Sequence, residues 1–398
     1  MAYTFTDADI DYLCSDIGVS ALGEIGRLTL TKSSMLSDIG AVRSSYGDRA
    51  GPLVETVRLR RKAQSKIADG ENWLLTDDAV QQATPSHIAQ RRAARLAGRD
   101  VHDVTCSIGT ELAALSATPG LAVGSDLDPV RLRMASHNVP GARILRADAL
   151  TSTTRGTVVL ADPGRRAGGR RTHDPAALEP PLPLLLDAYA GRDVVVKCAP
   201  GLDFDKLGWA GEIELVSLDG GVKEACLWSA GLTSTEIHRR ASVLSSDGAC
   251  EEITDAEPDD IDVAEPGAWL IDPDGAVVRA GLVRHYAARH GLWQLDPRIA
   301  YLTGNSVPPG VNGFRVLDQI KFSEKSLRLA LAAYHCGSVE ILVRGVDVDP
   351  AVLRPRLKLK GELALSVVIT RIERSAIAFL CEARRPGGVN QAGVNHEV

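Results

Sequence analysis

The chain has 398 residues, which is too long for one ordinary core and predicts two or three domains. Hydrophobic residues make up 44% and charged residues 24%, a composition that is typical of globular proteins and excludes a disordered chain. The net charge of -6 and the aromatic content of 4% exclude a uniformly basic polyanion binder and a platform of many stacked rings.

Cysteine spacing and the N-terminal segment indicate the cellular environment. The seven cysteines are widely spaced without a CxxC pair, which favours reduced thiols and predicts neither a disulfide framework nor a metal site. The N-terminal segment is acidic and lacks the pattern of a signal peptide, and no run approaches the roughly 18 apolar residues of a membrane span. We therefore expect a cytoplasmic protein with no membrane partner and no metal.

Residues 1–98 are predicted to form a helical N-terminal domain. Apolar residues recur at helical spacing, first at Leu13, Ile17, Leu22 and Ile25. A later helix is expected to start at Pro85-Ser86 and to end at Gly98. Its apolar face consists of Ile88, Ala89, Ala93 and Leu96. The rest of its surface is expected to carry Arg91, Arg92, Arg95 and Arg99.

Between residues 99 and 232, short apolar runs alternate with helical segments. The runs are VHDVTC, LAVGSD, ARIL, TVVLAD, DVVVKC, EIELVSL and KEACLWSA. This alternation predicts a mostly parallel sheet with crossover helices. The last two runs are close together and predict an antiparallel hairpin at the edge of the sheet.

The remaining chain is predicted to contain a linker, a small domain and a tail. No Lys or Arg occurs between Arg240 and Arg279, and eight acidic residues crowd between Glu251 and Glu265, so 233–268 is expected to be an extension with an acidic loop or linker. Residues 269–385 mix helices with strands such as VEILVRG and LALSVVIT, which indicates an α+β domain. The tail, 386–398, is expected to be disordered.

An acidic residue follows each of four successive predicted strands: Asp103, Asp126, Asp148 and Asp162. One such acid is commonplace as a cap or turn residue, whereas four at the same carboxyl edge indicate a ligand site. Asp126 is placed to accept hydrogen bonds from ribose hydroxyls, while Asp128 before Pro129 is expected to cap a helix. The dinucleotide pattern GxGxxG is absent, which disfavours a nicotinamide or flavin cofactor.

With these acids in order, the chain resembles the class I S-adenosylmethionine-dependent methyltransferases, which have a Rossmann-like sheet. The resemblance implies S-adenosyl-L-methionine as cofactor. It assigns the methionine end to the loop of Asp103, Thr105, Ser107 and Gly109. It assigns the ribose contacts to Asp126 and Leu127, and the contacts with the adenine to Asp148 and Ala149. In related enzymes a segment before the first strand folds over the cofactor, and Gln82, Thr84 and Ser86 are candidates for it, with helix capping as the alternative. Thr105 and Ser107 stand where glycines are common in the family.

Further motifs are similar to a bacterial group of these enzymes with a THUMP-like C-terminal domain. They are Gln82-Ala83-Thr84, DxTCSIG, ADPGRR, KCAPGLD and EILVRG. In amino-methylating relatives an acid or amide, two prolines and an aromatic residue hold the acceptor. Here Gly164 and Arg165 follow Asp162-Pro163, a form more similar to RNA methyltransferases that act on ring positions. Asp162 and Pro163 are therefore the predicted catalytic residues, and Lys197 is expected to pair with an acid at this edge.

Two basic groups are candidates for RNA phosphate contacts. The first follows the catalytic motif and comprises Arg165, Arg166, Arg170 and Arg171, with a solvated loop as the alternative. The second comprises Arg354, Arg356, Lys358 and Lys360, whose alternate spacing would place them on one face of an extended segment. An edge strand protected by charge is the alternative interpretation of the second group.

Cys198 lies where RNA pyrimidine-C5 methyltransferases keep a nucleophilic cysteine, although a small buried residue at a strand end is the commoner case. The sequence thus predicts a methyltransferase acting on a base in structured RNA, either tRNA or rRNA. The alternatives are a non-catalytic RNA-binding protein with a decayed methyltransferase fold, and a methyltransferase of a small molecule or protein. The methylated atom and the oligomeric state stay open.

Overall fold

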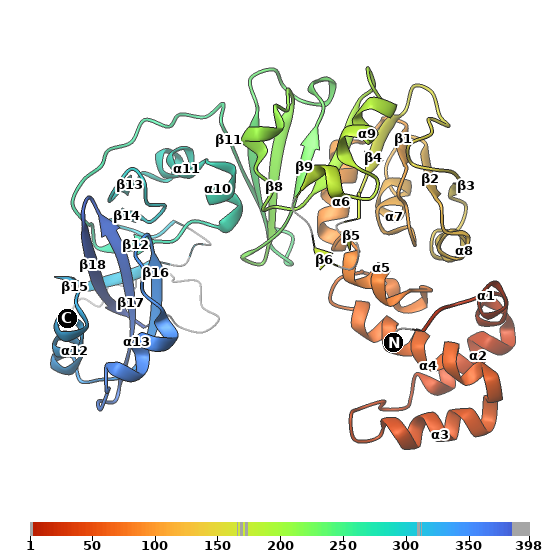
Figure 1. Cartoon of the computed structure of the whole chain (residues 1–398), viewed down its shortest axis with the longest axis horizontal. Helices are drawn as coiled ribbons and strands as arrows, with labels where there is room; N and C mark the ends of the chain where they lie inside the picture. Colours follow the sequence, from red (N-terminus) through yellow and green to blue (C-terminus); the bar gives the residue numbers. More distant parts are fainter. Residues whose placement is uncertain are drawn as a thin grey trace, which may run out of the picture. The chain divides into compact units, whose positions relative to one another are not determined.

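The computed structural model describes residues 3–164, 166–167, 170–171, 174–308, 311 and 313–383 (Figure 1). Contacts divide the chain into two compact units. The first consists of Met1–Asp219, Lys223–Thr235 and Leu244–Cys250, and the second of Gly220–Val222, Glu236–Val243 and Glu251–Val398.

Helices dominate the chain before residue 99, as the sequence predicts. They are α1 (Asp7–Cys14), α2 (Asp16–Ile25), α3 (Met35–Tyr46), α4 (Ala50–Ala63), α5 (Asp77–Gln82) and α6 (Ser86–Arg95). Thr6 caps α1 and Ser15 caps α2. Leu13, Leu22 and Ile25 are buried, but Ile17 is 71% exposed. The break at Ser15 starts a new helix, so the single helical face expected from spacing does not continue across it.

A nine-stranded sheet, counted over the described residues, has the order β11-β10-β8-β9-β7-β4-β1-β2-β3. Its central strands are β1 (Val101–Asp103), β2 (Ala122–Asp126), β3 (Arg143–Arg146), β4 (Val158–Ala161) and β7 (Val194–Cys198). All neighbours among these five strands are parallel. The crossovers contain α7 (Thr110–Ser116), α8 (Pro129–Asn138) and α9 (Leu182–Ala188). This is the Rossmann-like arrangement expected from the alternation of strands and helices.

The predicted edge hairpin is not at the edge. β9 (Gly221–Trp228) lies between β7 and β8 (Glu212–Leu218), and β10 (Arg239–Leu244) and β11 (Cys250–Thr254) extend the sheet beyond β8. The acidic segment is therefore partly a strand. Two of its acidic side chains form ion pairs: Glu252 Oε2 lies 2.5 Å from Arg240 Nη1, and Glu257 Oε2 lies 2.5 Å from Arg289 Nη2. Pairing with distant arginines permits strand structure despite the local excess of negative charge.

Helix α6 carries three arginines that the sequence pattern places on its surface, and the structure buries Arg92 and half-buries Arg91 and Arg95. The reason is a set of buried acids on the adjacent strands. Arg95 Nη1 lies 2.8 Å from Glu212 Oε1 and 2.7 Å from Glu214 Oε2, and Arg92 pairs with Glu224 of β9. Only the expectation for Arg99, which is exposed, holds among these residues.

The second unit contains a seven-stranded sheet of order β13-β14-β12-β15-β18-β17-β16, counted over the described residues. The strands are β12 (Trp269–Ile271), β13 (Trp293–Gln294), β14 (Leu302–Gly304), β15 (Gly313–Lys321), β16 (Cys336–Arg344), β17 (Leu363–Ile372) and β18 (Ser375–Glu382). The helices are α10 (Gly275–Ala280), α11 (Val283–His290), α12 (Glu324–Ala333) and α13 (Pro350–Arg356). The predicted mixture of helices and strands is confirmed, while the predicted tail lies outside the described residues.

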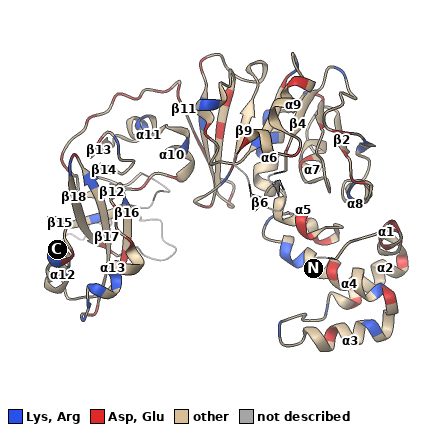
Figure 2. Cartoon of the chain, in the orientation of Figure 1, with Lys and Arg blue, Asp and Glu red and all other residues tan. Residues whose placement is uncertain are grey.

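The second basic group does not form an extended segment. Arg354 and Arg356 occupy the last turn of α13, and Lys358 follows with a left-handed backbone (φ 50°). Asp349 caps this helix, and Leu353 and Leu357 bury its apolar side. Apolar spacing of four residues thus overrides the alternation of charges. All four cations are exposed, and blue segments mark them at α13 and in the loop that follows (Figure 2).

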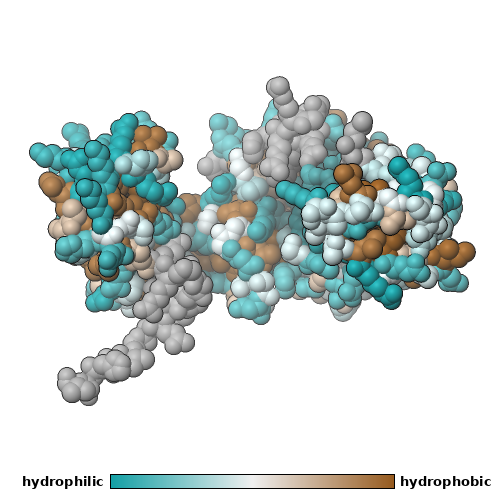
Figure 3. Space-filling view, turned by 90° about the horizontal axis from the view of Figure 1, so that it is seen from below, coloured by the Kyte–Doolittle hydropathy of each residue, from teal (hydrophilic) through white to brown (hydrophobic). Residues whose placement is uncertain are grey.

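The described residues contain no helix long and apolar enough to cross a membrane. On the face shown in Figure 3, apolar residues lie in separate groups among hydrophilic ones.

Candidate active site

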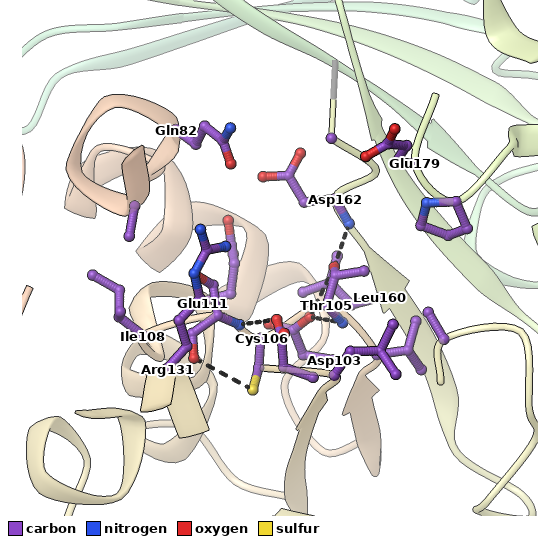
Figure 4. A pocket seen from close by; sticks show the side chains of 18 of the residues that line it. Gln82, Asp103, Thr105, Cys106, Ile108, Glu111, Arg131, Leu160, Asp162 and Glu179 are labelled. Atoms are coloured by element: carbon purple, nitrogen blue, oxygen red, sulfur yellow. Dashed lines mark hydrogen bonds between the residues drawn. The ribbon is translucent and has the colours of Figure 1, made fainter. Parts of the chain in front are cut away.

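A cavity of about 610 Å³ opens in the first unit at the carboxyl ends of β1, β2 and β4 (Figure 4). The four strand-end acids of the sequence analysis all line it. Three further acids line it as well, so the complete acidic set is Asp78, Asp103, Glu111, Asp126, Asp148, Asp162 and Glu179. Arg131 is the basic residue among the lining side chains. The cavity wall is therefore strongly acidic and rich in hydrogen-bond acceptors.

Thr105 explains why this loop has a side chain where relatives often have glycine. Its amide N donates to Asp103 Oδ1 at 3.1 Å, which closes a tight turn after β1. Its hydroxyl accepts a hydrogen bond from the amide N of Asp162 at 2.7 Å. The β1 loop is thereby tied to the end of β4, and a glycine could not make this second contact.

Ser107 and Gly109 shape the rest of the loop through left-handed backbone conformations. Ser107 has φ 50° and Gly109 has φ 92°. A Cβ atom at Gly109 would lie 3.0 Å from Val139 Cγ2, so both conformation and space favour glycine. Ser107 lines the cavity, whereas Gly109 does not. Gly109 acts through the backbone at the start of α7.

Asp126 holds two loops with its carboxylate. Oδ2 accepts the amide of Ser107 at 3.0 Å, and Oδ1 accepts the amide of Asp128 at 2.9 Å. A carboxylate has about four lone-pair positions, so acceptor capacity is left for a ligand. Asp128 accepts from the amides of Val130 and Arg131, which confirms its predicted capping of α8.

Most of the remaining residues that were expected to contact the cofactor also line the cavity. Asp148 Oδ1 accepts the amide of Leu150 at 2.9 Å, and both Asp148 and Ala149 line the cavity. Leu127 lines it and is 59% exposed. Gln82 lines the cavity from the end of α5, but Thr84 is 3% exposed and lies outside the lining.

Burial alters the proton affinity of two lining acids in opposite directions. Asp103 is 2% exposed, and desolvation together with the nearby charge of Glu111 raises its pKa to about 8. Burial alone would also raise the pKa of Glu111, but the charges of Arg92 and Lys197 outweigh it and lower that pKa to about 2. Near neutral pH the cavity therefore has an ionised Glu111 beside a partly protonated Asp103.

Asp162 lies on the side of the cavity where Figure 4 also shows Gln82 and Glu179. Its side chain is 35% exposed, and Oδ2 lies 2.5 Å from Lys197 Nζ, which confirms the predicted pairing of Lys197 with an acid at this edge. Pro163 is buried and lies outside the cavity lining. The next residue, Gly164, exchanges two backbone hydrogen bonds with Glu179, at 2.7 and 3.0 Å.

The first basic group is described only in part. Arg165 lies outside the described residues. Backbone positions alone are described for the two short paired strands β5 (Arg166–Ala167) and β6 (Arg170–Arg171), which contain the other three arginines of the group.

Sequence reasoning gave no role to Glu111, Arg131 or Glu179. Glu111 gives little signal in the sequence, because an acid in the first turn of a helix is already explained by the helix dipole. Nothing in the local sequence around Arg131 and Glu179 indicates that they line the cavity, because only the folding of the chain brings them to it. The described parts of the chain contain no group of His, Cys, Asp and Glu side chains that could hold a metal ion.

The hydrogen-bond acceptors and the negative charge of the cavity wall fit S-adenosylmethionine. The cofactor presents a sulfonium and an ammonium, both positive, together with hydroxyl and amine donors. An acidic wall with Asp126 and Asp148 at neighbouring strand ends supplies acceptors for such groups. Arg131 Nε lies 3.5 Å from Asp128 Oδ2, and its other guanidinium donors could bind the carboxylate of a ligand.

Comparisons with known proteins agree with this chemistry. Residues 311–383 match the family model of THUMP domain-like sequences. A crystal structure of a protein from Porphyromonas gingivalis W83, assigned as a methyltransferase, has the same fold, with a TM-score of 0.72 and 17% identity over 96% of this chain and 99% of that one.

Two proteins of Mycobacterium tuberculosis, from strains CDC 1551 and H37Rv, are each described as an uncharacterized S-adenosylmethionine-dependent methyltransferase. Each is 55% identical to this chain over 361 residues, which are 86% of this chain and 100% of the relative. Identity at this level over nearly the whole chain, together with the acidic cavity at the sheet edge, establishes that the chain belongs to the S-adenosylmethionine-dependent methyltransferases.

Proposed function

We propose that this methyltransferase modifies a base in structured RNA and that Asp162 presents the acceptor atom. The observation that carries the proposal is the place of Asp162, which shares one cavity with Asp103, Asp126 and Asp148 and is partly exposed there. An acceptor that reaches Asp162 would lie beside the bound cofactor. Positioning of the two reactants would then be the main catalytic contribution.

The cofactor contacts follow from the lining. We assign the methionine end to Asp103, Thr105 and Ser107, with Gly109 supporting the loop. We assign the ribose to Asp126 and Leu127, and the adenine region to Asp148 and Ala149. Gln82 would cover the cofactor. Thr84, which is buried outside the cavity lining, would support the segment that contains Gln82 without touching the cofactor. When bound, the cofactor supplies an electrophilic methyl group on a sulfonium sulfur, and the acidic wall favours that positive charge.

Binding of S-adenosylmethionine is expected to strengthen with pH through the titration of Asp103. Its pKa is raised to about 8, so protonation removes a negative charge from the wall below that pH. A cation prefers the ionised form, and affinity should therefore rise by up to about tenfold from pH 7 to pH 9. Calorimetry at several pH values measures this. The Asp103→Asn variant retains any titration of the cofactor itself and should lack the additional rise; an unchanged rise would contradict the role of Asp103.

Cys198 is expected to be dispensable. It is 5% exposed and lies outside the cavity lining. Successive strand residues point to opposite faces, and Lys197 already reaches Asp162. The Cys198→Ala variant should keep most of its activity, and wild type should form no covalent adduct with 5-fluoropyrimidine RNA. A gel-stable adduct that vanishes in Cys198→Ala would instead establish pyrimidine C5 methylation through a thiolate.

The C-terminal region supports RNA as the acceptor. Residues 311–383, which match the THUMP-like family model, contain eleven Lys and Arg against eight Asp and Glu, whereas the whole chain has a net charge of -6. The exposed cations of α13 and its following loop contribute to this excess. Phosphate contacts need such local positive charge.

The decisive experiment is transfer of tritium from labelled cofactor to RNA from cells that lack this gene, followed by nucleoside mass spectrometry. Labelled RNA would support the proposal. RNA binding without incorporation of label would favour a non-catalytic RNA-binding protein with a decayed methyltransferase fold. Label found only in protein or small molecules would contradict RNA as the acceptor and favour methylation of those molecules instead.

A charge-removal variant tests the contribution of the C-terminal region. The double variant Arg354→Gln with Lys360→Gln should weaken RNA binding. The slope of log affinity against log salt concentration should also fall, by an amount that corresponds to the loss of up to about two phosphate contacts. Arg43→Gln with Lys206→Gln removes the same charge from exposed positions in the first unit and serves as the control. Equal effects of both pairs would contradict a specific RNA surface.

A further inference from the structure

One buried lysine contacts three separate segments of the first unit. Lys197 is 6% exposed, and its Nζ lies 2.5 Å from Asp162 Oδ2 and 3.6 Å from Glu111 Oε1. It also donates a hydrogen bond to Thr84 Oγ1. These partners come from the end of β4, from the first turn of α7 and from the segment between α5 and α6.

The three segments belong to different walls of the same cavity. Gln82 and Ala83, which directly precede Thr84, line it, and Asp162 and Glu111 line it themselves. A single ammonium group therefore links the segment proposed to cover the cofactor with the carboxylate proposed to present the acceptor. Because the contact uses Oδ2 of Asp162, it also sets the direction of the other oxygen.

Lys197 is in turn held by a buried charge cluster. Arg92, 3% exposed, pairs with both Glu111 and Glu224, which are themselves buried. Burial alone would lower the pKa of Lys197, but the charges of Asp162, Glu224 and Glu111 outweigh it and raise that pKa. The lysine thus stays an ammonium. Buried ion clusters add little net stability compared with apolar packing, so stability is a weak reason for placing one here.

We propose that Lys197 is a positioning residue for methyl transfer, which fixes the Asp162 carboxylate relative to the Gln82–Thr84 segment. The proposal rests on the role of Asp162 given above. Lys197 itself would touch neither acceptor nor cofactor. Loss of this constraint would leave the cofactor bound and misplace the acceptor.

The test compares Lys197→Met, Lys197→Arg and Thr84→Val in single-turnover methylation and cofactor calorimetry. Lys197→Met should slow transfer about 100-fold, as expected for a small misplacement of a reacting group, with cofactor affinity within threefold of wild type. Lys197→Arg keeps the charge and should recover part of the rate. Thr84→Val keeps all charges, removes one hydrogen bond and should lose about tenfold. A merely structural role would reduce the fraction that binds cofactor but leave the rate of that bound fraction unchanged.

Hydrogen exchange supplies a readout that does not depend on the acceptor. In Lys197→Met, amides around residues 82–84 and 160–164 should exchange faster together. If wild type binds cofactor but labels no RNA, the RNA proposal fails, and this exchange result decides the proposal for Lys197.

Three results would overturn the positioning role: a wild-type transfer rate in cofactor-bound Lys197→Met, a Thr84→Val rate within twofold of wild type if Lys197→Met does not fold, or unchanged exchange in both segments.

Discussion

The Asp162→Ala variant is expected to lose about 1,000-fold or more of its methyl-transfer rate while it still binds S-adenosylmethionine. Asp162 lines the cavity on the side where we propose that the acceptor binds, and its side chain is partly exposed. Its backbone amide, which bonds Thr105, is unaffected by the substitution. The loop that would hold the methionine end should therefore stay in place, while the substitution removes acceptor positioning, proton acceptance and the ion pair with Lys197. Single-turnover kinetics with saturating cofactor measure the rate.

Removal of a carboxylate from the other end of the sheet is the matched control. Asp193 precedes β7 and bonds Ser229 at 2.8 Å, away from the cavity lining. Asp193→Ala should keep a rate near that of wild type. If Asp162→Ala transferred methyl groups at a tenth of the wild-type rate or faster, the acceptor would be held by other residues, with Glu179 the next candidate in the wall.

The second large effect is expected at Asp126, where the Ala variant should bind S-adenosylmethionine at least about 100-fold more weakly, or about 2.8 kcal/mol. The substitution removes the proposed partner of the ribose hydroxyls. It also leaves the amides of Ser107 and Asp128 without their acceptor, so the loops on either side lose a shared anchor. Calorimetry with S-adenosylmethionine and S-adenosylhomocysteine should show the same loss, because both contain the ribose.

Asp128→Ala provides the comparison for Asp126. Asp128 is two residues away and caps α8, so its loss should lower the unfolding temperature with a much smaller effect on affinity. Affinity of Asp126→Ala within threefold of wild type would exclude Asp126 from cofactor binding.

The sequence predicted the central sheet and the meeting of four acids because both depend on local order along the chain. Each parallel strand ends at the same edge, so Asp103, Asp126, Asp148 and Asp162 come together once the strands are correctly identified. The hydroxyl contact of Thr105 could not be predicted in this way, because it joins loops that are 57 residues apart.

The expectation for α6 is wrong because charges that are distant in sequence pair there. The arginines of α6 resemble a solvated face until Glu212, Glu214 and Glu224 are brought beneath them. In the acidic stretch, β11 extends the sheet, and Arg240 and Arg289 pair with Glu252 and Glu257. Charge spacing also misplaced the group after Arg354, where Leu353 and Leu357 determine a helix.

The paired backbone of Gly164 and Glu179 makes the chain between them a replaceable module. Its two ends are fused by hydrogen bonds of 2.7 and 3.0 Å, two residues beyond Asp162. A change in the length of the chain between them is therefore expected to leave Asp162 in register, at a closure cost of about 0.6 kcal/mol for each doubling of length. We therefore expect that sequence changes in this segment, by natural drift or by grafting, can alter what reaches the cavity without moving the end of β4.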